Sequence, residues 1–373
     1  MKKILLICPK FTPSNTVSVH RNKFFVEKLS VENKVDIWVS DRKTNYSDFF
    51  NEVTVLPEGL VDSFKNVFKN GHGIKNYVYK HGSKYDQVII SCPEFTLLSF
   101  AIPFRKLGAK VILDIRDLPD MIYFNYKKQG VSLLFLRYLF LKVVESYIKF
   151  ISKTSDLVIC VGLESERILN DWGINAVSVH NGFLESDVTN HRPETKVISH
   201  RKIIKIGCGG NVYDFRDSEA LRNLIDVLDS ESSYMFELHH YGKLSSKLLG
   251  FVSKKKYLKY YSYSQVDREI YLKALVNYDL SLLVTSDCLI WEPTTTVFDY
   301  ILLNSKILFV GSAKEAKNIL ISSKTDFIDC NDIDIPQLIE FVERKAIVRN
   351  EIDLYSREFQ YEKFKKYYER LCN

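Results

Sequence analysis

The stretch TSDCLIWEPTTTVFDYILLNSKILFVG, residues 285–311, gives the clearest indication of the fold. Apolar runs at 279–284 and 306–310 on either side of its loop are typical of short buried strands. The loop leads into a helix predicted at 297–303, where a proline and three threonines form a helix-start signal and a threonine hydroxyl can cap the first turn. In open α/β sheets, a strand, a loop onto a helix N-terminus and a second strand build anion-binding ligand sites. We therefore expect a ligand site here, beside the carboxylates of Glu292 and Asp299.

Short apolar runs alternate with helical patterns along the rest of the chain, in two blocks. Strands are predicted in the first block at 3–8, 34–39, 86–91, 110–115, 155–161 and 176–180, and in the second at 202–208, 236–241, 258–261, 280–284 and 306–310. Helices are predicted between them, including 95–107 and 131–153, and a polar, aromatic-rich helix ends the chain. A chain of 373 residues is too long for one comfortable core. The sequence therefore predicts two doubly wound, Rossmann-like α/β domains that face each other across a cleft. Their predicted limits are 1–185 and 202–350, with a polar linker at 186–201 and the final helix within 351–373.

Composition excludes few classes of function. The hydrophobic content of 46% and the charged content of 26% are ordinary for a globular protein, and a net charge of +6 does not identify nucleic acid as a partner. The seven cysteines form no CxxC pair, which favours buried thiols in a reducing cytoplasm over disulfides or a zinc site. The first apolar run is too short for a signal peptide, and no run approaches the roughly 20 apolar residues of a membrane span. We expect a cytoplasmic protein.

A glycine-rich turn, Gly209-Gly210-Asn211, follows the first strand of the second block. It matches neither the Walker A nor the GxGxxG pattern, so it is either a turn that lets a phosphate or sugar approach the backbone or a plain strand-to-helix turn. Arg216 follows shortly, and its planar guanidinium suits a diphosphate. The alternative for Arg216 is a surface ion pair with Asp214 or Asp217.

Three further features favour a structural role. Asp332-Ile333-Asp334 matches a DxD metal motif, but its place before Pro336 indicates a helix start. His239 and His240 are adjacent in a predicted strand, so they point to opposite faces and form no metal site alone. The helix at 131–153 has broad apolar faces and a basic edge, which indicates a core helix. A membrane-surface patch, to which 65–84 could contribute, is the alternative reading of that helix.

The order of these motifs resembles the retaining glycosyltransferases of the GT-B fold, in particular the large family 4 type that includes many bacterial polysaccharide enzymes. Asp114-Ile115-Arg116-Asp117-Leu118 is similar to a D-x-RDL segment of that family, and 209–217 to its G-x-Y-x-x-RD segment. Further similar segments are Pro9, Pro13 and Arg21, 86–93, 155–158, Asn181-Gly182, 278–280 and 295–300. The chain departs from the family pattern at its acids, because six residues separate Glu292 from Asp299 where relatives commonly have seven, and the second acid is Asp.

The resemblance implies transfer of a sugar from a nucleotide-sugar donor, most often a UDP-sugar, to a polysaccharide or lipid-linked oligosaccharide, with retention of configuration. It implies no metal and no cofactor, an acceptor on the first domain, a donor on the second and a final helix that packs back toward the first. Peripheral attachment at the inner face of the cell membrane is left open. The departures keep two other functions open: a nucleotide-sugar-binding or scaffold protein without activity, and a nucleotide-sugar 2-epimerase.

The resemblance also assigns roles to particular residues. The catalytic candidates are Glu292, Arg216 and Asp117. The donor-binding candidates are Gly209, Gly210, Asn211, Lys243, Tyr261, Thr294, Thr295, Thr296 and Asp299, and the acceptor-side candidates are Asn15, His20 and Arg116. Alternatives are a solvated loop acid for Glu292 and simple complementarity to a helix dipole for Asp299.

Overall fold

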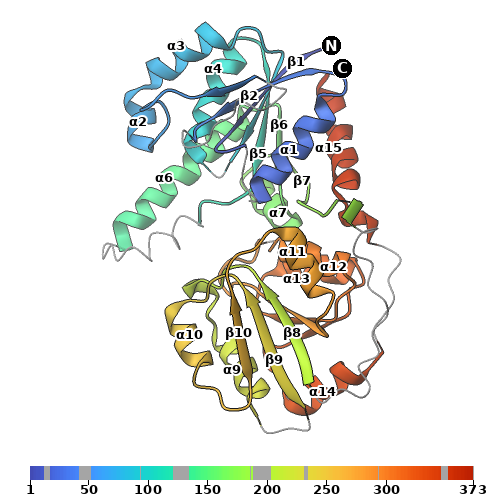
Figure 1. Ribbon diagram of the computed structural model, residues 1–373. Coiled ribbons are helices and arrows are strands. Elements are labelled where there is room, and N and C mark those ends of the chain that lie inside the picture. The colour runs from blue at the N-terminus through green and yellow to red at the C-terminus, as the bar shows by residue number, and fades with distance from the viewer. Residues whose placement is uncertain are drawn as a thin grey trace. The chain divides into compact units, whose positions relative to one another are not determined.

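The computed structural model (Figure 1) describes residues 1–11, 17–41, 52–92, 94–120, 134–184, 186–187, 203–230, 234–292, 294–345 and 352–372. The chain divides into two compact units, one formed by Met1–Asn181 with Tyr361–Asn373 and the other by Gly182–Gln360. The division falls slightly before the end of the predicted first domain, and most of the predicted linker lies outside the described residues. The two units are hereafter called unit 1 and unit 2.

The sheet of unit 1 has seven strands in the order β3-β2-β1-β4-β5-β6-β7, and every neighbouring pair is parallel. The strands are β1 (Lys3–Cys8), β2 (Lys34–Val39), β3 (Val53–Val55), β4 (Gln87–Ser91), β5 (Lys110–Ile115), β6 (Leu157–Cys160) and β7 (Ala176–Ser178). The central strands are buried almost throughout, which explains their continuous apolar runs. The short edge strand β3 carries no such run and was not predicted.

One of the helices predicted in unit 1 is wrong in the structure. The helices of unit 1 are α1 (Val17–Leu29), α2 (Phe64–Lys69), α3 (Gly71–His81), η1 (Phe95–Phe100), α4 (Ala101–Lys106), α6 (Leu134–Lys153) and α7 (Leu163–Asp171). The single helix predicted at 95–107 is a 3₁₀ helix followed by the α-helix α4. Pro103 accounts for the restart, because proline lacks an N–H and is tolerated only in the first turn of an α-helix.

The sheet of unit 2 has six parallel strands in the order β10-β9-β8-β11-β12-β13. The strands are β8 (Ile203–Gly209), β9 (Met235–Tyr241), β10 (Lys259–Tyr263), β11 (Leu280–Val284), β12 (Ile307–Val310) and β13 (Phe327–Asp329). Successive residues of β11 point to opposite faces and enter different hydrophobic clusters, with Leu282 in one and Leu283 in the other. The sheet is therefore covered on both faces, and the predicted fold class of two doubly wound, Rossmann-like α/β units is confirmed.

Helices α9, α10 and α14 supply side chains to the first of these clusters, and α11, α12 and α13 to the second. The helices of unit 2 are η2 (Asp214–Arg216), α9 (Glu219–Leu228), α10 (Ser246–Val252), α11 (Arg268–Leu275), α12 (Thr296–Leu302), α13 (Lys314–Ser322), α14 (Ile335–Glu343) and η3 (Asp353–Tyr355). Asp334 caps α14 in a capping box with Gln337, which confirms the helix-start interpretation of the DxD motif. The predicted threonine cap of α12 is wrong, because the N-cap residue Thr295 makes no side-chain cap bond.

The last helix, α15 (Arg357–Cys372), begins in unit 2 and ends in unit 1. In unit 1, Phe364 stacks on Phe25 of α1 with ring centroids 5.0 Å apart, and the Tyr368 hydroxyl donates to Gln87 Oε1 of β4. Within the described residues, no helix combines the length and apolar character needed to cross a membrane. The six cysteines whose side chains are described are free thiols, and all but Cys288 are buried.

Candidate functional site

The strand order of unit 2 reverses direction between β8 and β11, which are hydrogen-bonded neighbours. Loops that leave the carboxyl ends of two such strands run in opposite directions and open a crevice, where doubly wound proteins bind their ligands. The glycine-rich turn follows β8, and the loop that carries Glu292 follows β11. The fold therefore brings the two predicted donor-side segments to one edge of the sheet.

Two glycines shape the end of β8 for different reasons. A Cβ on Gly209 would lie 2.0 Å from Tyr271 Oη and 3.0 Å from Thr296 Cγ2, so the missing side chain lets α11 and α12 approach the strand. Gly210 has φ of +91° with open space around its missing Cβ, and its carbonyl oxygen lies 2.8 Å from His240 Nε2. Gly209 thus serves packing, while Gly210 makes a left-handed turn beside open space.

Arg216 and Glu292, 76 residues apart in sequence, form an ion pair between Arg216 Nη2 and Glu292 Oε1. Arg216 Nη1 also donates to the carbonyl oxygen of Asn211 at 2.9 Å. The predicted alternative partner Asp217 pairs instead with Arg222, at 2.7 Å. The structure therefore joins two predicted catalytic residues rather than making a local surface pair of Arg216.

Both carboxylate oxygens of Glu292 have donors, because Oε2 accepts the amide of Ser286 at 3.4 Å. Two other polar atoms of the candidate site, Arg216 Nε and Thr294 Oγ1, are buried and have no hydrogen-bond partner within the described residues. Buried polar groups in folded proteins almost always have partners, so such atoms are available to a ligand. Ser286 was not singled out in the sequence, because its role depends on a backbone amide.

Asn211 and Lys243 join the turn after β8 to the turn after β9. The amide of Lys243 donates to Asn211 Oδ1 at 2.9 Å, and the Lys243 carbonyl oxygen accepts the amide of Val212 at 2.9 Å. The Lys243 side chain is exposed. These bonds fix the loop that supplies the Asn211 carbonyl to Arg216.

Asp299, on α12, lies in a cluster of four charged residues within unit 2. Its Oδ1 accepts bonds from Arg268 Nε at 2.9 Å and Nη2 at 2.7 Å, and Arg268 Nη1 donates to Asp187 at 2.6 Å. Burial raises the pKa of Asp299, while Arg268 opposes the rise. Burial, together with the nearby charge of Arg268, lowers the pKa of Arg357 from 12.5 to about 10. Asp299 is thus bonded to Arg268 of α11. The sequence reasoning missed this cluster of contacts.

Tyr261 lies on the edge strand β10, with 39% of its surface exposed. Its ring stacks on His239 at 4.6 Å between centroids, and His239 also stacks on Tyr278 at 4.8 Å. Burial lowers the pKa of His239 despite the neighbouring carboxylate of Glu237. Tyr261 therefore ends an aromatic stack and does not contact the Arg216–Glu292 pair in any described interaction.

The acceptor-side candidates lie in unit 1, where the strand order reverses between β1 and β4. Arg116 follows β5, and its Nε donates to the carbonyl oxygen of Cys92 just after β4. Arg116 Nη2 is buried without a partner among the described atoms. Asp117 and His20 are partly buried, and Asn15 lies outside the described residues. The structure thus turns Arg116 toward the reversal point of the sheet in unit 1.

A buried ion pair between Arg21 and Asp114 lies near the carboxyl end of β5. Arg21 donates through Nε and Nη2 to the two oxygens of Asp114 at 3.1 and 3.0 Å, and through Nη1 to the carbonyl oxygens of Val179 and His180. Both side chains are almost fully buried. Sequence reasoning missed this pair because its members are 93 residues apart.

Within the described part of the chain, no group of three or more His, Cys, Asp or Glu side chains is arranged to hold a metal ion. Burial raises the pKa of the Cys8 thiol to about 12, although the nearby Arg116 opposes the rise. Cys8 is therefore protonated at neutral pH and is a poor nucleophile.

No protein-family model matches the chain, and no curated protein sequence matches it. Solved structures do match. A mutant of S. aureus TarM in complex with fondaparinux, α-GlcNAc-glycerol and UDP is 12% identical, with a TM-score of 0.63 over 98% of this chain and 99% of that one. Anabaena Alr3699/HepE in complex with UDP and glucose is 13% identical, with a TM-score of 0.57 over 100% and 98%. The fold is that of the GT-B glycosyltransferases.

The same fold is shared by a structure described as a putative UDP-N-acetylglucosamine 2-epimerase from Listeria monocytogenes. It is 10% identical, with a TM-score of 0.58 over 97% of this chain and 94% of that one. At sequence identities this low, the structural similarity establishes the fold of the chain but not its reaction. The reaction has to be argued from the chain's own residues.

Proposed function

We propose that the chain is a glycosyltransferase that moves a sugar from a nucleotide-sugar donor, a UDP-sugar in the first instance, to a polysaccharide or lipid-linked oligosaccharide. The observation that carries the proposal is the Arg216–Glu292 pair at the strand reversal of unit 2, with Arg216 Nε and Thr294 Oγ1 buried and without a hydrogen-bond partner in the part of the chain that the structure describes. Two of the structurally similar proteins hold UDP, and one of these also holds glucose. The proposal assigns the donor to unit 2 and the acceptor to unit 1.

In the proposed reaction, the bond between the anomeric carbon and the diphosphate breaks, and an acceptor hydroxyl oxygen bonds to that carbon. The departing diphosphate takes the hydroxyl proton, so no side chain is needed as general base. Arg216 neutralises the charge that develops on the diphosphate, a contribution that is usually the largest a protein makes. Glu292 holds Arg216 in place and stabilises positive charge at the anomeric carbon. We propose that the reaction retains the anomeric configuration, which proton NMR of the product tests.

Supporting roles follow from position. We assign the diphosphate to the amides and hydroxyls of Thr294, Thr295 and Thr296, with Gly209, Gly210, Asn211 and Lys243 in the loops beside it. We assign the ribose to Asp299 and the base to Tyr261. In unit 1, His20, Arg116 and Asp117 are assigned to the acceptor, with Asn15 as a further candidate outside the described residues.

The decisive experiment compares donor binding and sugar transfer in matched variants. Thermal shifts against UDP-, GDP- and CMP-sugars identify the donor, and the best binder is then assayed with saccharide and lipid-linked acceptors. Arg216→Ala and Glu292→Ala should each reduce turnover by about a hundredfold or more, because losing one preorganised electrostatic group typically costs that much. Both variants should keep a cooperative unfolding transition.

The surface pair Lys273–Glu269 on α11 provides the control, because it is an ion pair of similar length in the same unit with both members exposed. Lys273→Ala and Glu269→Ala should leave turnover unchanged. Wild-type turnover in both Arg216→Ala and Glu292→Ala contradicts the site assignment. Donor conversion without any acceptor indicates an epimerase instead, and donor binding with no turnover of any acceptor indicates a binding or scaffold protein.

Metal independence is part of the proposal, since Arg216 and the start of α12 can neutralise a diphosphate. Turnover should be unchanged in EDTA; loss of turnover that Mg²⁺ or Mn²⁺ restores contradicts it. We also propose that the protein works in the cytoplasm, at the inner face of the membrane when its acceptor is lipid-linked.

A further inference from the structure

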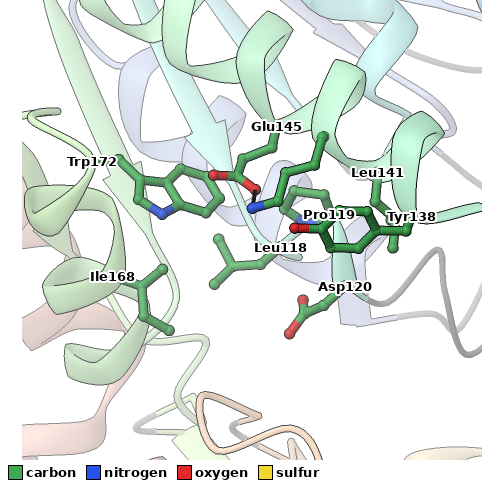
Figure 2. A pocket seen from close by; sticks show the side chains of 9 residues that line it. Leu118, Pro119, Asp120, Tyr138, Leu141, Glu145, Ile168 and Trp172 are labelled. Carbon is green, nitrogen blue, oxygen red and sulfur yellow. Dashed lines mark hydrogen bonds and ion pairs between the residues drawn. The ribbon is translucent and has the colours of Figure 1, made fainter. Parts of the chain in front are cut away.

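Unit 1 contains a cavity of about 230 Å³ between the segment after β5, helix α6 and helix α7 (Figure 2). Figure 2 shows the Trp172 ring at one end of the cavity and the Tyr138 ring at the other. Apolar side chains line it together with the charged side chains of Asp120, Lys142 and Glu145. This mixed lining is compatible with several classes of ligand and does not identify one.

In unit 2, the hydroxyl of Tyr300 joins two neighbouring strands near their carboxyl ends. Tyr300 lies on α12 and is fully buried. Its Oη accepts the amide of Gly209, the last residue of β8, at 3.1 Å. The same hydroxyl donates to the carbonyl oxygen of Leu282 in β11, also at 3.1 Å. One side chain of α12 thus bridges the two strands between which the strand order reverses.

A second tyrosine hydroxyl completes this set of bonds. Tyr271 of α11 is buried, and its Oη lies 3.2 Å from Tyr300 Oη. A hydroxyl has one proton to donate, and that of Tyr300 goes to Leu282, so Tyr271 is the donor between the two tyrosines. Burial raises the pKa of both hydroxyls above the ordinary value, which keeps both protons in place at neutral pH. The Tyr300 oxygen therefore uses its one donor and both of its acceptor positions.

The hydroxyl pair packs directly against the end of β8. A Cβ on Gly209 would lie 2.0 Å from Tyr271 Oη, a distance that real Cβ atoms do not show. A residue with a side chain at this position would therefore displace the hydroxyls, and with them the bond from the Gly209 amide to Tyr300.

The two strands lead into the two halves of the candidate donor site. The glycine turn leaves β8 at Gly209, and the carbonyl oxygen of Asn211 in this turn accepts Arg216 Nη1 at 2.9 Å. The loop that leaves β11 contains Glu292, which pairs with Arg216. A shift of one strand end relative to the other would move these groups apart. Displacements of about 1 Å in a site can cost about a hundredfold in rate.

We propose that Tyr300 is a positioning residue of the donor site. Its hydroxyl fixes the end of β8 against β11, and with it the glycine turn against the loop of Glu292. In this role Tyr300 acts through the backbone groups of Gly209 and Leu282 and does not itself contact the donor. The inference rests on the proposed function, which assigns the donor to these loops.

The test compares Tyr300→Phe with Tyr271→Phe in the intact chain. Tyr300→Phe keeps the ring but removes the hydroxyl, so the Gly209 amide and the Leu282 carbonyl oxygen lose this partner and the strand ends can shift. Tyr271→Phe is the matched control, because it removes a buried hydroxyl of the same set and leaves both bonds from Tyr300 to the strands. Both variants should unfold at a lower temperature than the wild type, and all three proteins are compared where they are folded.

Isothermal titration calorimetry with UDP, and with GDP as a second probe, measures the expected difference. Tyr300→Phe should raise the dissociation constant about tenfold or more, because only a fraction of the molecules then hold both loops in the binding position. Tyr271→Phe should bind as the wild type does. A purely structural role of Tyr300 would reduce the folded fraction, which lowers the stoichiometry of binding and leaves the dissociation constant unchanged.

In a transfer assay, Tyr300→Phe should likewise raise the KM for the donor and leave the KM for the acceptor unchanged. A wild-type dissociation constant in Tyr300→Phe overturns the positioning role, and so does an equal weakening in Tyr271→Phe. A wild-type chain that binds neither UDP nor GDP overturns the proposed function and this inference with it. A failure of the positioning role is therefore distinguishable from a failure of the proposed function.

Discussion

The bonding of two arginines, the buried Arg21 and the partly buried Arg216, distinguishes a structural charge from a functional one. Arg21 uses Nε, Nη1 and Nη2 within the protein, all on Asp114 and two backbone carbonyls. Arg216 uses Nη1 and Nη2 but leaves Nε buried and without a partner within the described residues. A buried charge whose donors are all used holds its strands together. A partly buried charge with a buried donor that no described group uses has capacity for a ligand, which is why we place the chemistry at Arg216.

Another buried cation, Lys306, gives a prediction on pH. Its ammonium group donates to the carbonyl oxygens of Phe341, Val342 and Arg344, where α14 ends. Burial lowers the pKa of Lys306 from 10.5 to about 8. Between pH values of about 8 and 10.5, the unfolded chain binds a proton at Lys306 and the folded chain does not. The free energy of unfolding therefore increases as the pH rises from about 8 toward 10.5. We expect a gain of roughly 1–3 kcal/mol, measured by denaturant unfolding at a series of pH values.

The variant Lys306→Met should lose this rise with pH, whatever its absolute stability. Lys314→Met is the control, because Lys314 is exposed at the start of α13 in the same unit, and its rise should match that of the wild type. A rise that persists in Lys306→Met would assign it to another group.

Among the elements, α12 carries the proposed donor contacts, although it is only seven residues long. Helices this short are marginal on their own. Its first residue, Thr296, lies where a Cβ on Gly209 would clash, and its Asp299 is held by Arg268 of α11. Tyr300, fully buried, donates to the carbonyl oxygen of Leu282 in β11. The position of α12 is therefore set by its neighbours rather than by its own helix propensity.

The Arg268–Asp299 pair should be measurable as a coupling between α11 and α12. Arg268→Gln and Asp299→Asn should each lower the free energy of unfolding by about 3 kcal/mol, because each leaves a net charge in this largely buried cluster of two arginines and two aspartates. The double variant should cost less than the sum, with a coupling energy of about 1–3 kcal/mol from a double-mutant cycle.

The exposed pair Lys273–Glu269, on the same helix α11, is the reference cycle. Its coupling energy should be at most about 0.5 kcal/mol, as for other exposed i,i+4 pairs. Additive effects at Arg268 and Asp299 would mean that the cluster does not hold α12.

At the scale of the whole molecule, the chain returns from unit 2 to complete unit 1. Phe364 of α15 is fully buried between Phe25, Tyr361 and Tyr368. Phe364→Ala should lower the free energy of unfolding by about 3–5 kcal/mol, the usual cost of removing a buried aromatic ring. Phe359→Ala, which removes a half-exposed ring from the same helix, should cost less than about 1 kcal/mol. Denaturant unfolding of both variants measures the difference.

Phe364→Ala also separates folding from donor binding. The proposed donor residues lie in unit 2, so the variant should still show the thermal shift that UDP gives the wild type. Loss of the UDP response in Phe364→Ala would contradict the assignment of the donor to unit 2 alone.

Prediction from sequence succeeded where the signal is local. The buried parallel strands were predicted because their residues form continuous apolar runs, as in β1 and β11. The start of α14 was predicted because Asp334 lies two residues before Pro336, which is a local helix-start signal. Prediction failed for the three-residue edge strands β3 and β13, and for α10, whose local patterns are weak.

The amino-acid sequence alone establishes two blocks of alternating strands and helices, and hence the doubly wound fold, because periodicity and burial act over a few neighbouring residues. The choice of partner for each buried charge belongs to the tertiary structure. Glu292 lies 76 residues from Arg216, and Asp114 lies 93 residues from Arg21, so no pattern in the chain joins them. The parallel sheets bring these side chains together, since a crossover connection places strands that are distant in sequence next to each other.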